Sequence, residues 1–256
     1  MNKFLEYVPG NSLLHRLNPI TKLFFAVLFA IACFCTSNPI FLGCMLVFGY
    51  VLAVSCGMMR QAVGLTKGVL AFSLLLAIVM LLTNSSGEAL VPLPWGYIGT
   101  GGIVAAVLII VRLIAAAIPL FLLFYVTKIS DLTNACVKVL HIPYKYAFTF
   151  SSTVHFIPVF MNDMRGIMEA QTARGVEFDR GGIVNKVRLM VPLCVPLLVG
   201  SVRKTNSAAI AAEVRGFNLR TRASGYKRYP FTAADIGTLA LGVALLAGAI
   251  ALGVLL

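Results

Sequence analysis

The chain has little charge, and acidic residues are especially scarce. Only 12% of its 256 residues are charged and 9 are Asp or Glu, whereas soluble domains carry about 25% charged residues. Hydrophobic residues make up 59% and the mean hydropathy is +0.93. A soluble globule of this size cannot bury so much apolar surface, because its interior is limited. The composition excludes an ordinary soluble enzyme and a disordered chain, and it predicts an integral membrane protein.

The motifs that would indicate catalysis are also missing. No G-x-x-x-x-G-K-[ST] loop occurs, so the chain cannot hydrolyse ATP through such a phosphate-binding loop. The six cysteines form no C-x-x-C pair and none stands at zinc spacing with a His. The acidic residues are dispersed, with Glu177 and Asp179 as the one close pair, whereas metal-dependent lipid enzymes need clustered carboxylates. We therefore expect no catalytic residue, no cofactor and no metal site.

The strong positive balance does not indicate nucleic acid. The formal net charge is +12, from 21 Lys and Arg, but membrane proteins collect these residues in their cytoplasmic loops. Nucleic-acid binding is therefore not expected. The first 17 residues are polar and mixed, which is not the pattern of a cleavable signal peptide.

Long apolar runs predict an all-α protein with about five transmembrane helices. A spanning helix needs about 20 apolar residues, with about 17 as a lower limit. The expected spans are Lys22 to Ser37, Ile40 to Cys56, Gly68 to Leu82, Gly102 to Val126 and Ile236 to Leu256. The plan has three parts: residues 1–127 with four spans, a long segment at 128–232, and the last span at 233–256.

Loop charges predict how the spans are oriented. The connection from Thr83 to Gly101 contains no Lys or Arg, whereas 15 of these residues lie between Lys128 and Thr232. Because cytoplasmic loops are enriched in Lys and Arg, the N-terminus and the long segment are expected on the cytoplasmic side. Arg112 lies inside the fourth span, where a charge is costly. Either it makes a polar contact inside the bundle or it snorkels outward.

The long segment is expected to form helices of its own, because structureless loops of this length are uncommon in compact domains. One helix should begin at Ser130 and run to Val139. An amphipathic helix should run from Val159 to Thr172, after Pro158. A third should extend from Ile183 to Val214. Small residues in its second half suit a close helix crossing, namely Ser201, Ser207, Ala208, Ala209, Ala211 and Ala212.

Two of these helices end in the same way. Ala173, Arg174 and Gly175 close one, and Val214, Arg215 and Gly216 close the other, 41 residues later. A cation is favoured at a helix C-terminus, and Gly lets the chain turn away so that the Arg side chain projects. The guanidinium could then grip a carboxylate on a partner. The alternative interpretation is an ordinary helix C-cap for each copy.

These segments resemble a known family over nearly the whole chain. The chain is similar to the transmembrane T component of energy-coupling-factor (ECF) vitamin and metal importers, which are ATP-driven. The similarity lies in the segments Tyr7–Ser12, Leu14–Pro19 and Thr21–Leu23 near the N-terminus, and in Glu169–Gly175 and Ala212–Phe217.

The resemblance implies a function and a set of partners. The family's two cytoplasmic coupling helices end in X-Arg-Gly motifs whose Arg residues enter grooves of two ABC-type ATPase subunits. The T component of the family also binds a small substrate-binding membrane protein, the S component. The resemblance therefore implies a non-catalytic coupling subunit in the cell membrane of a prokaryote, with the six residues Ala173, Arg174, Gly175, Val214, Arg215 and Gly216 as the ATPase-coupling site.

The main alternative is a secondary transporter that binds its substrate directly. Such proteins carry ionisable residues or broken helices near the membrane midplane, often in two repeated halves. Arg112 alone meets the first condition, and no repeat is visible. An intramembrane enzyme would need a constellation of nucleophile and base that the sequence does not contain. The transported substrate is not readable from this chain.

Overall fold

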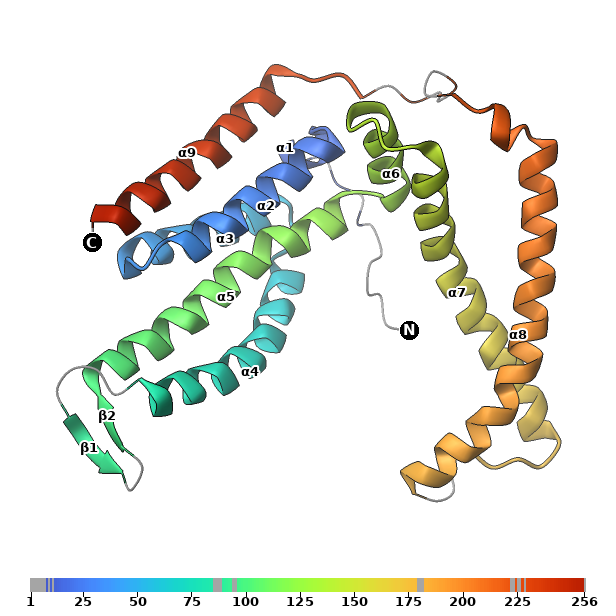
Figure 1. Cartoon of the computed structure of the whole chain (residues 1–256), viewed down its shortest axis with the longest axis horizontal. Coiled ribbons are helices and arrows are strands. Elements are labelled where there is room, and N and C mark those ends of the chain that lie inside the picture. Colours follow the sequence, from blue (N-terminus) through green and yellow to red (C-terminus); the bar gives the residue numbers. More distant parts are fainter. Residues whose placement is uncertain are drawn as a thin grey trace. The chain divides into compact units, whose positions relative to one another are not determined.

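The computed structural model describes residues 8, 10, 12–84, 89–93, 96–178, 182–221, 224, 227 and 229–255. The chain forms two compact units, the first made of Met1–Ala135 and Tyr229–Leu256 and the second of Cys136–Arg228. Helices dominate the described residues (Figure 1). This confirms the predicted all-α membrane protein.

The first unit is a bundle of apolar helices. In chain order it contains α1 (Leu13–Arg16), α2 (Pro19–Cys35), α3 (Pro39–Ser55), α4 (Met59–Thr83), α5 (Thr100–Val126), the start of α6 (Ile129–Val139) and α9 (Ala233–Leu255). Three helices among the described residues are long and apolar enough to cross a membrane, namely α4, α5 and α9, while α2 and α3 are shorter apolar helices.

An Asn-Pro pair begins each of the two shorter helices. The side chain of Asn18 accepts a hydrogen bond from Ile20 N at 3.1 Å, and that of Asn38 accepts one from Ile40 N at 3.0 Å. Asn is a favoured N-cap, and Pro is tolerated at the first helical position because its missing N–H would have no partner there. The same dipeptide that interrupts the apolar run after Ser37 therefore starts the next helix.

The connection between α4 and α5 holds the two β-strands of the described part of the chain. Strands β1 (Ala89–Leu93) and β2 (Gly96–Gly99) pair antiparallel. Helix α4 begins at Met59, nine residues before the expected start of the span, because Arg60 and Lys67 are tolerated on exposed positions of its first turns. Gly102 lets α5 start close to α4, since a Cβ there would stand 2.7 Å from Asn84 O.

The core of the bundle lies between α2, α3 and α5. Phe29, Leu42 and Met45 are buried against Ala115 and Ala116 of α5. The small side chains of α5 let the two shorter helices approach closely, as small residues do between membrane helices. Figure 1 shows α9 running alongside α2.

Arg112 makes a polar contact inside this bundle. Its guanidinium donates to Thr36 O at 2.6 Å, at the C-terminal end of α2. The last carbonyls of a helix have no partner within the helix and carry partial negative charge. Arg112 therefore stabilises the end of α2, which favours the inward contact over outward snorkelling.

A buried carboxylate fastens α9 to α2. Asp235 is 1% exposed, and its Oδ1 accepts a hydrogen bond from Asn18 N at 2.8 Å. Its Oδ2 accepts from Thr232 N at 2.8 Å and from Thr232 Oγ1 at 2.7 Å, so the same carboxylate also caps the start of α9. Asn18 in turn donates through Nδ2 to Tyr229 O at 3.1 Å.

Burial, with the nearby Asp131 carboxylate, raises the pKa of the Tyr229 hydroxyl to about 12.

The second unit consists mainly of two long helices. Helix α7 runs from Tyr144 to Ala173 and α8 from Ile183 to Val214, followed by the short 3₁₀ helix η1 (Phe217–Leu219). The prediction that Pro158 separates two segments was wrong, because α7 continues through it. An internal Pro removes one backbone hydrogen bond and kinks a helix without necessarily ending it. Pro192 and Pro196 likewise lie inside α8.

Candidate functional site

The first Arg-Gly motif is the C-terminal end of α7. The helix ends at Ala173, Arg174 is the C-cap residue and Gly175 has φ +91°. Gly175 N donates to Thr172 O at 2.9 Å, and Val176 N donates to Gln171 O at 3.1 Å. These two bonds define a Schellman motif, in which the left-handed residue is usually Gly because it has no Cβ.

The second motif repeats this geometry at the end of α8. The helix ends at Val214, Arg215 is the C-cap residue and Gly216 has φ +71°. Gly216 N donates to Glu213 O at 2.9 Å, which is the same bond that Gly175 makes in α7. Both glycines turn the chain off the helix axis immediately after the Arg.

Both arginines are exposed. Neither guanidinium makes a hydrogen bond or an ion pair with any residue that the structure describes. Val214 beside Arg215 is 83% exposed. An ordinary C-cap needs only the Gly, and the helix dipole favours any cation at these two positions, so no contact within the described chain requires a guanidinium there.

The two helices run in opposite directions and cross, as Figure 1 shows within the second unit. An ion pair bridges them: Lys204 Nζ of α8 lies 2.7 Å from Asp163 Oδ1 of α7. Arg174 follows Asp163 by 11 residues and Arg215 follows Lys204 by 11 residues. At about 1.5 Å per residue each Arg lies roughly 16 Å beyond the bridge, in opposite directions. The two motifs therefore stand at opposite ends of the pair, roughly 30 Å apart.

An aromatic cluster fixes the chain directly after the second motif. The ring of Phe217 lies 4.8 Å from that of Phe148 and 5.5 Å from that of Tyr144, measured between centroids. Arg220 lies over the Tyr144 ring at 4.5 Å and donates to its hydroxyl at 2.6 Å. Such ring pairs and cation–π contacts are each worth about 0.5–1.5 kcal/mol. After the turn at Gly216, Phe217 packs against the start of α7. These contacts fix the backbone next to Arg215, whose side chain stays exposed.

The small residues of α8 are not what contacts α7. Ala208, Ala209 and Ala211 are exposed and Ala212 is half-buried, whereas Leu193 is 3% exposed on the part of α8 that precedes Lys204. The expected close crossing at the alanines is therefore not made within the described chain. Sequence reasoning also missed Asp163 and Lys204. Their spacing of 41 residues, equal to that of the two arginines, was the signal that could have found them.

The described residues contain no group of three or more His, Cys, Asp or Glu side chains that could hold a metal ion. The cysteines among them are free. The site consists of two exposed guanidinium groups at the ends of the α7–α8 pair. Exposed guanidinium groups are suited to binding carboxylates on another chain.

Comparison with known proteins places the chain among membrane transport proteins. The family model described as "CbiQ: Cobalt transport protein" matches residues 10–224. Three curated relatives are each named energy-coupling factor transporter transmembrane protein EcfT. The relative from Bacillus selenitireducens is 30% identical over 83% of this chain and 82% of its own length. That from Streptococcus thermophilus is 29% identical, covering 94% and 96%, and that from Bacillus subtilis is 30% identical, covering 90% and 90%.

Proposed function

Because this chain belongs to the CbiQ cobalt transport protein family, we propose that it is the transmembrane T component of an energy-coupling-factor importer. In this role it is a non-catalytic subunit that couples ATP hydrolysis on other chains to movement of a substrate-binding membrane partner. The observation that carries the proposal is the pair of similar helix ends, each with an exposed Arg at the C-cap followed by a Gly with positive φ, at Arg174 and Arg215.

Each arginine would dock on one of two ABC-type ATPase subunits. A guanidinium presents a planar fork of N–H donors that fits a carboxylate in bidentate fashion. Two such contacts roughly 30 Å apart would hold both ATPase subunits at once, and their approach during ATP binding would push on the two ends of the α7–α8 pair. Because α7 and α8 are bridged by Asp163 and Lys204, a push on one helix end would be passed to the other helix.

Substrate choice would reside in the partner and not in this chain. The one charged side chain in the middle of α5, Arg112, donates to the end of α2, so this residue does not favour direct substrate binding by a secondary transporter. We propose that a small substrate-binding membrane protein sits against the bundle, as the S component of an ECF importer. The word cobalt in the family's description does not decide the substrate.

The direct test of this role is co-purification after gentle solubilisation. We expect tagged protein to bring down two ATPase chains and one small membrane protein from its native membrane. Mass spectrometry of the intact complex would count the subunits. Recovery of the chain alone, together with substrate uptake by the isolated chain in vesicles, would instead make it a secondary transporter.

Orientation in the membrane follows from loop charge. We expect a single Cys at Ser86, which lies outside the described residues, to react with an impermeant maleimide added to intact cells. A single Cys at Gly182, exposed before α8, should react after the membrane is opened and not before. The reason is the positive-inside rule, which places the basic 128–232 segment and the N-terminus in the cytoplasm. Both tests need a background in which the six native cysteines are replaced by Ser. Labelling of Gly182→Cys in intact cells would show that the protein has the opposite orientation.

A further inference from the structure

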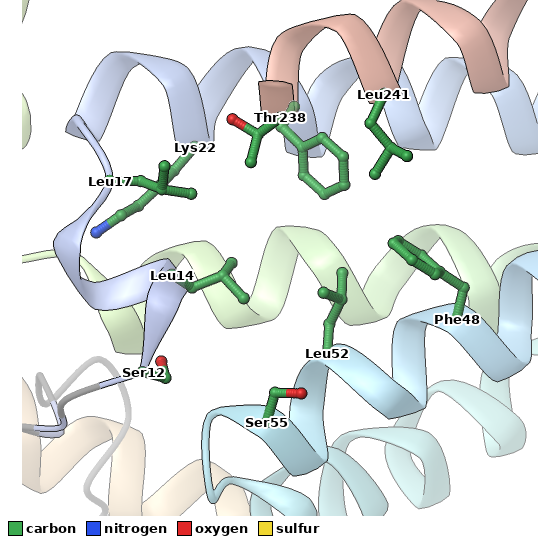
Figure 2. Close-up of a pocket in the computed structure, with 10 residues that line it drawn as sticks. Ser12, Leu14, Leu17, Lys22, Phe48, Leu52, Ser55, Thr238 and Leu241 are labelled. Carbon is green, nitrogen blue, oxygen red and sulfur yellow. The ribbon is translucent and has the colours of Figure 1, made fainter. Parts of the chain in front are cut away.

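A pocket in the first unit is apolar along its length and cationic at one end. It is lined by Ser12, Leu14, Leu17, Lys22, Phe25, Phe48, Leu52, Ser55, Thr238 and Leu241, and its volume is about 330 Å³. Figure 2 shows the Lys22 ammonium at one end, and Phe48 and Leu241 at the other. Pockets for small ligands range from roughly 300 to 1,000 Å³.

The cation is buried and only partly satisfied. Lys22 is 5% exposed, and within the described residues its ammonium makes one hydrogen bond, to His15 O at 3.3 Å. An ammonium carries three donors. The carboxylates of Asp131 and Asp235 attract the ammonium from a distance, but neither makes a hydrogen bond or an ion pair with it. A buried charge of this kind calls for an anionic partner.

The three hydroxyl groups of the pocket already have partners within this chain. Ser55 Oγ donates to Val51 O at 2.9 Å and Thr238 Oγ1 donates to Asp235 O at 2.9 Å, while Ser12 Oγ lies 2.6 Å from His15 Nδ1 in a hydrogen bond. The remaining wall is aliphatic and aromatic. The occupant that matches is a long apolar chain ending in one anionic group.

We propose that this pocket binds one acyl chain of an anionic membrane phospholipid, with the lipid phosphate at Lys22. The walls come from α1 with its two caps and from the apolar helices α2, α3 and α9, so most of the pocket is surrounded by helices that lie in the bilayer. An empty apolar cavity destabilises a protein in proportion to its volume, and basic pockets between membrane helices bind anionic lipid head groups. The inference needs only that the chain lies in a membrane, and it holds whether or not the chain is a coupling subunit.

The test measures lipid retained by the purified full-length chain in a neutral detergent. Dioleoylphosphatidylglycerol or dioleoylphosphatidylcholine is added at equal concentration, and native mass spectrometry counts bound lipid. We expect a preference for phosphatidylglycerol that falls roughly fivefold in Lys22→Met, the factor that one Lys near an anionic lipid corresponds to. Lys22→Arg should keep the preference, and Lys67→Met, which removes an exposed Lys on α4, should leave it unchanged.

A second arm tests the acyl chain and does not depend on Lys22. Phosphatidylglycerol with a photoreactive group at the chain end should crosslink the wild-type protein at Phe48 or Leu241. Thr238→Phe should fill the pocket and remove this crosslink, while Ile236→Phe, on an exposed position of the same helix, should not. Equal retention by Lys22→Met, or crosslinks that persist in Thr238→Phe, would overturn the proposal. The proposal would also be overturned if a co-purified membrane protein, and not the lipid, occupied the pocket and prevented the crosslinks at Phe48 and Leu241.

Discussion

Replacing both Arg174 and Arg215 with Ala should abolish substrate uptake while leaving the protein in the membrane. Both side chains are exposed and neither has a recorded partner in the described chain, so the fold does not depend on them. In the proposed complex each guanidinium is paired with a carboxylate of an ATPase subunit. Truncating one side of such a desolvated pair costs about 2–5 kcal/mol, because the other charge is left unpaired.

The single Ala variants and the Arg→Lys variants distinguish docking by the guanidinium from a general effect of positive charge. Each single Ala variant should lose part of the uptake and of ATPase pull-down, with the double variant losing most of both. Arg→Lys should also impair uptake, because a point charge cannot replace the bidentate fork. The matched controls are Arg165→Ala and Arg203→Ala, which remove exposed arginines from the middle of the same two helices.

The measurement is uptake in cells that express all subunits, together with pull-down of the ATPases and quantification of the chain in the membrane. Full uptake and full ATPase binding in the double variant would show that both motifs are helix caps and nothing more. Equal losses in the two control variants would point to general surface charge instead of the helix ends.

The second large effect is expected at Asp235. Asp235→Ala removes the acceptor of three hydrogen bonds and leaves the buried backbone N–H of Asn18 without a partner. An unsatisfied buried donor costs about 1–3 kcal/mol, and the capping of α9 adds about 1 kcal/mol more. We expect a total loss of about 2–4 kcal/mol in the free energy of unfolding.

In detergent this loss should lower Tm by several degrees, since about 2–4 °C corresponds to each kcal/mol in a chain of this size. The physical reason is detachment of α9 from α2, which should also lower the yield of monodisperse protein on size exclusion. Asp235→Asn keeps one acceptor oxygen and should lose less. Ile236→Ala is the matched control, because Ile236 is 66% exposed on the same helix; a Tm for Asp235→Ala equal to that of this control would contradict the anchoring role.

Local sequence placed the helix ends of the candidate site closely. Helices α7 and α8 end at Ala173 and Val214, immediately before the two arginines, and each following Gly has positive φ. This works because a C-cap is a local event: a Gly that can adopt the left-handed conformation ends the helix whatever surrounds it. The role of the arginines in binding ATPases stays a prediction.

Prolines predicted the ends of helices less well than glycines did. Pro158 was expected to separate two segments, yet α7 passes through it, as α8 passes through Pro192 and Pro196. The cost of an internal Pro is one lost backbone hydrogen bond and a steric clash, which neighbouring packing can offset. Whether it ends a helix therefore depends on tertiary contacts that local sequence does not contain.

The packing face of α9 was also not readable from the spacing of its small residues. The four-residue spacing of Ala240, Ala244 and Gly248 predicts a packing stripe, but Ala240 and Ala244 are exposed in the described chain, whereas Ala249 and Gly242 are buried where α9 meets the rest of the bundle. A Cβ at Gly253 would stand 2.8 Å from Cys35 O. A helix in a membrane has apolar residues on every side, so periodicity does not reveal which face is inward.

By itself the sequence determined the membrane class, the approximate positions of the apolar helices and the two Arg-Gly ends, because hydropathy and caps are properties of short segments. Only the tertiary structure decided which distant groups meet: Asp163 with Lys204, Asp235 with Asn18, and Arg112 with the end of α2. These pairs join residues 41, 217 and 76 positions apart. Their meeting depends on how whole helices pack, and packing is set by the combined shape of many side chains and not by any local pattern.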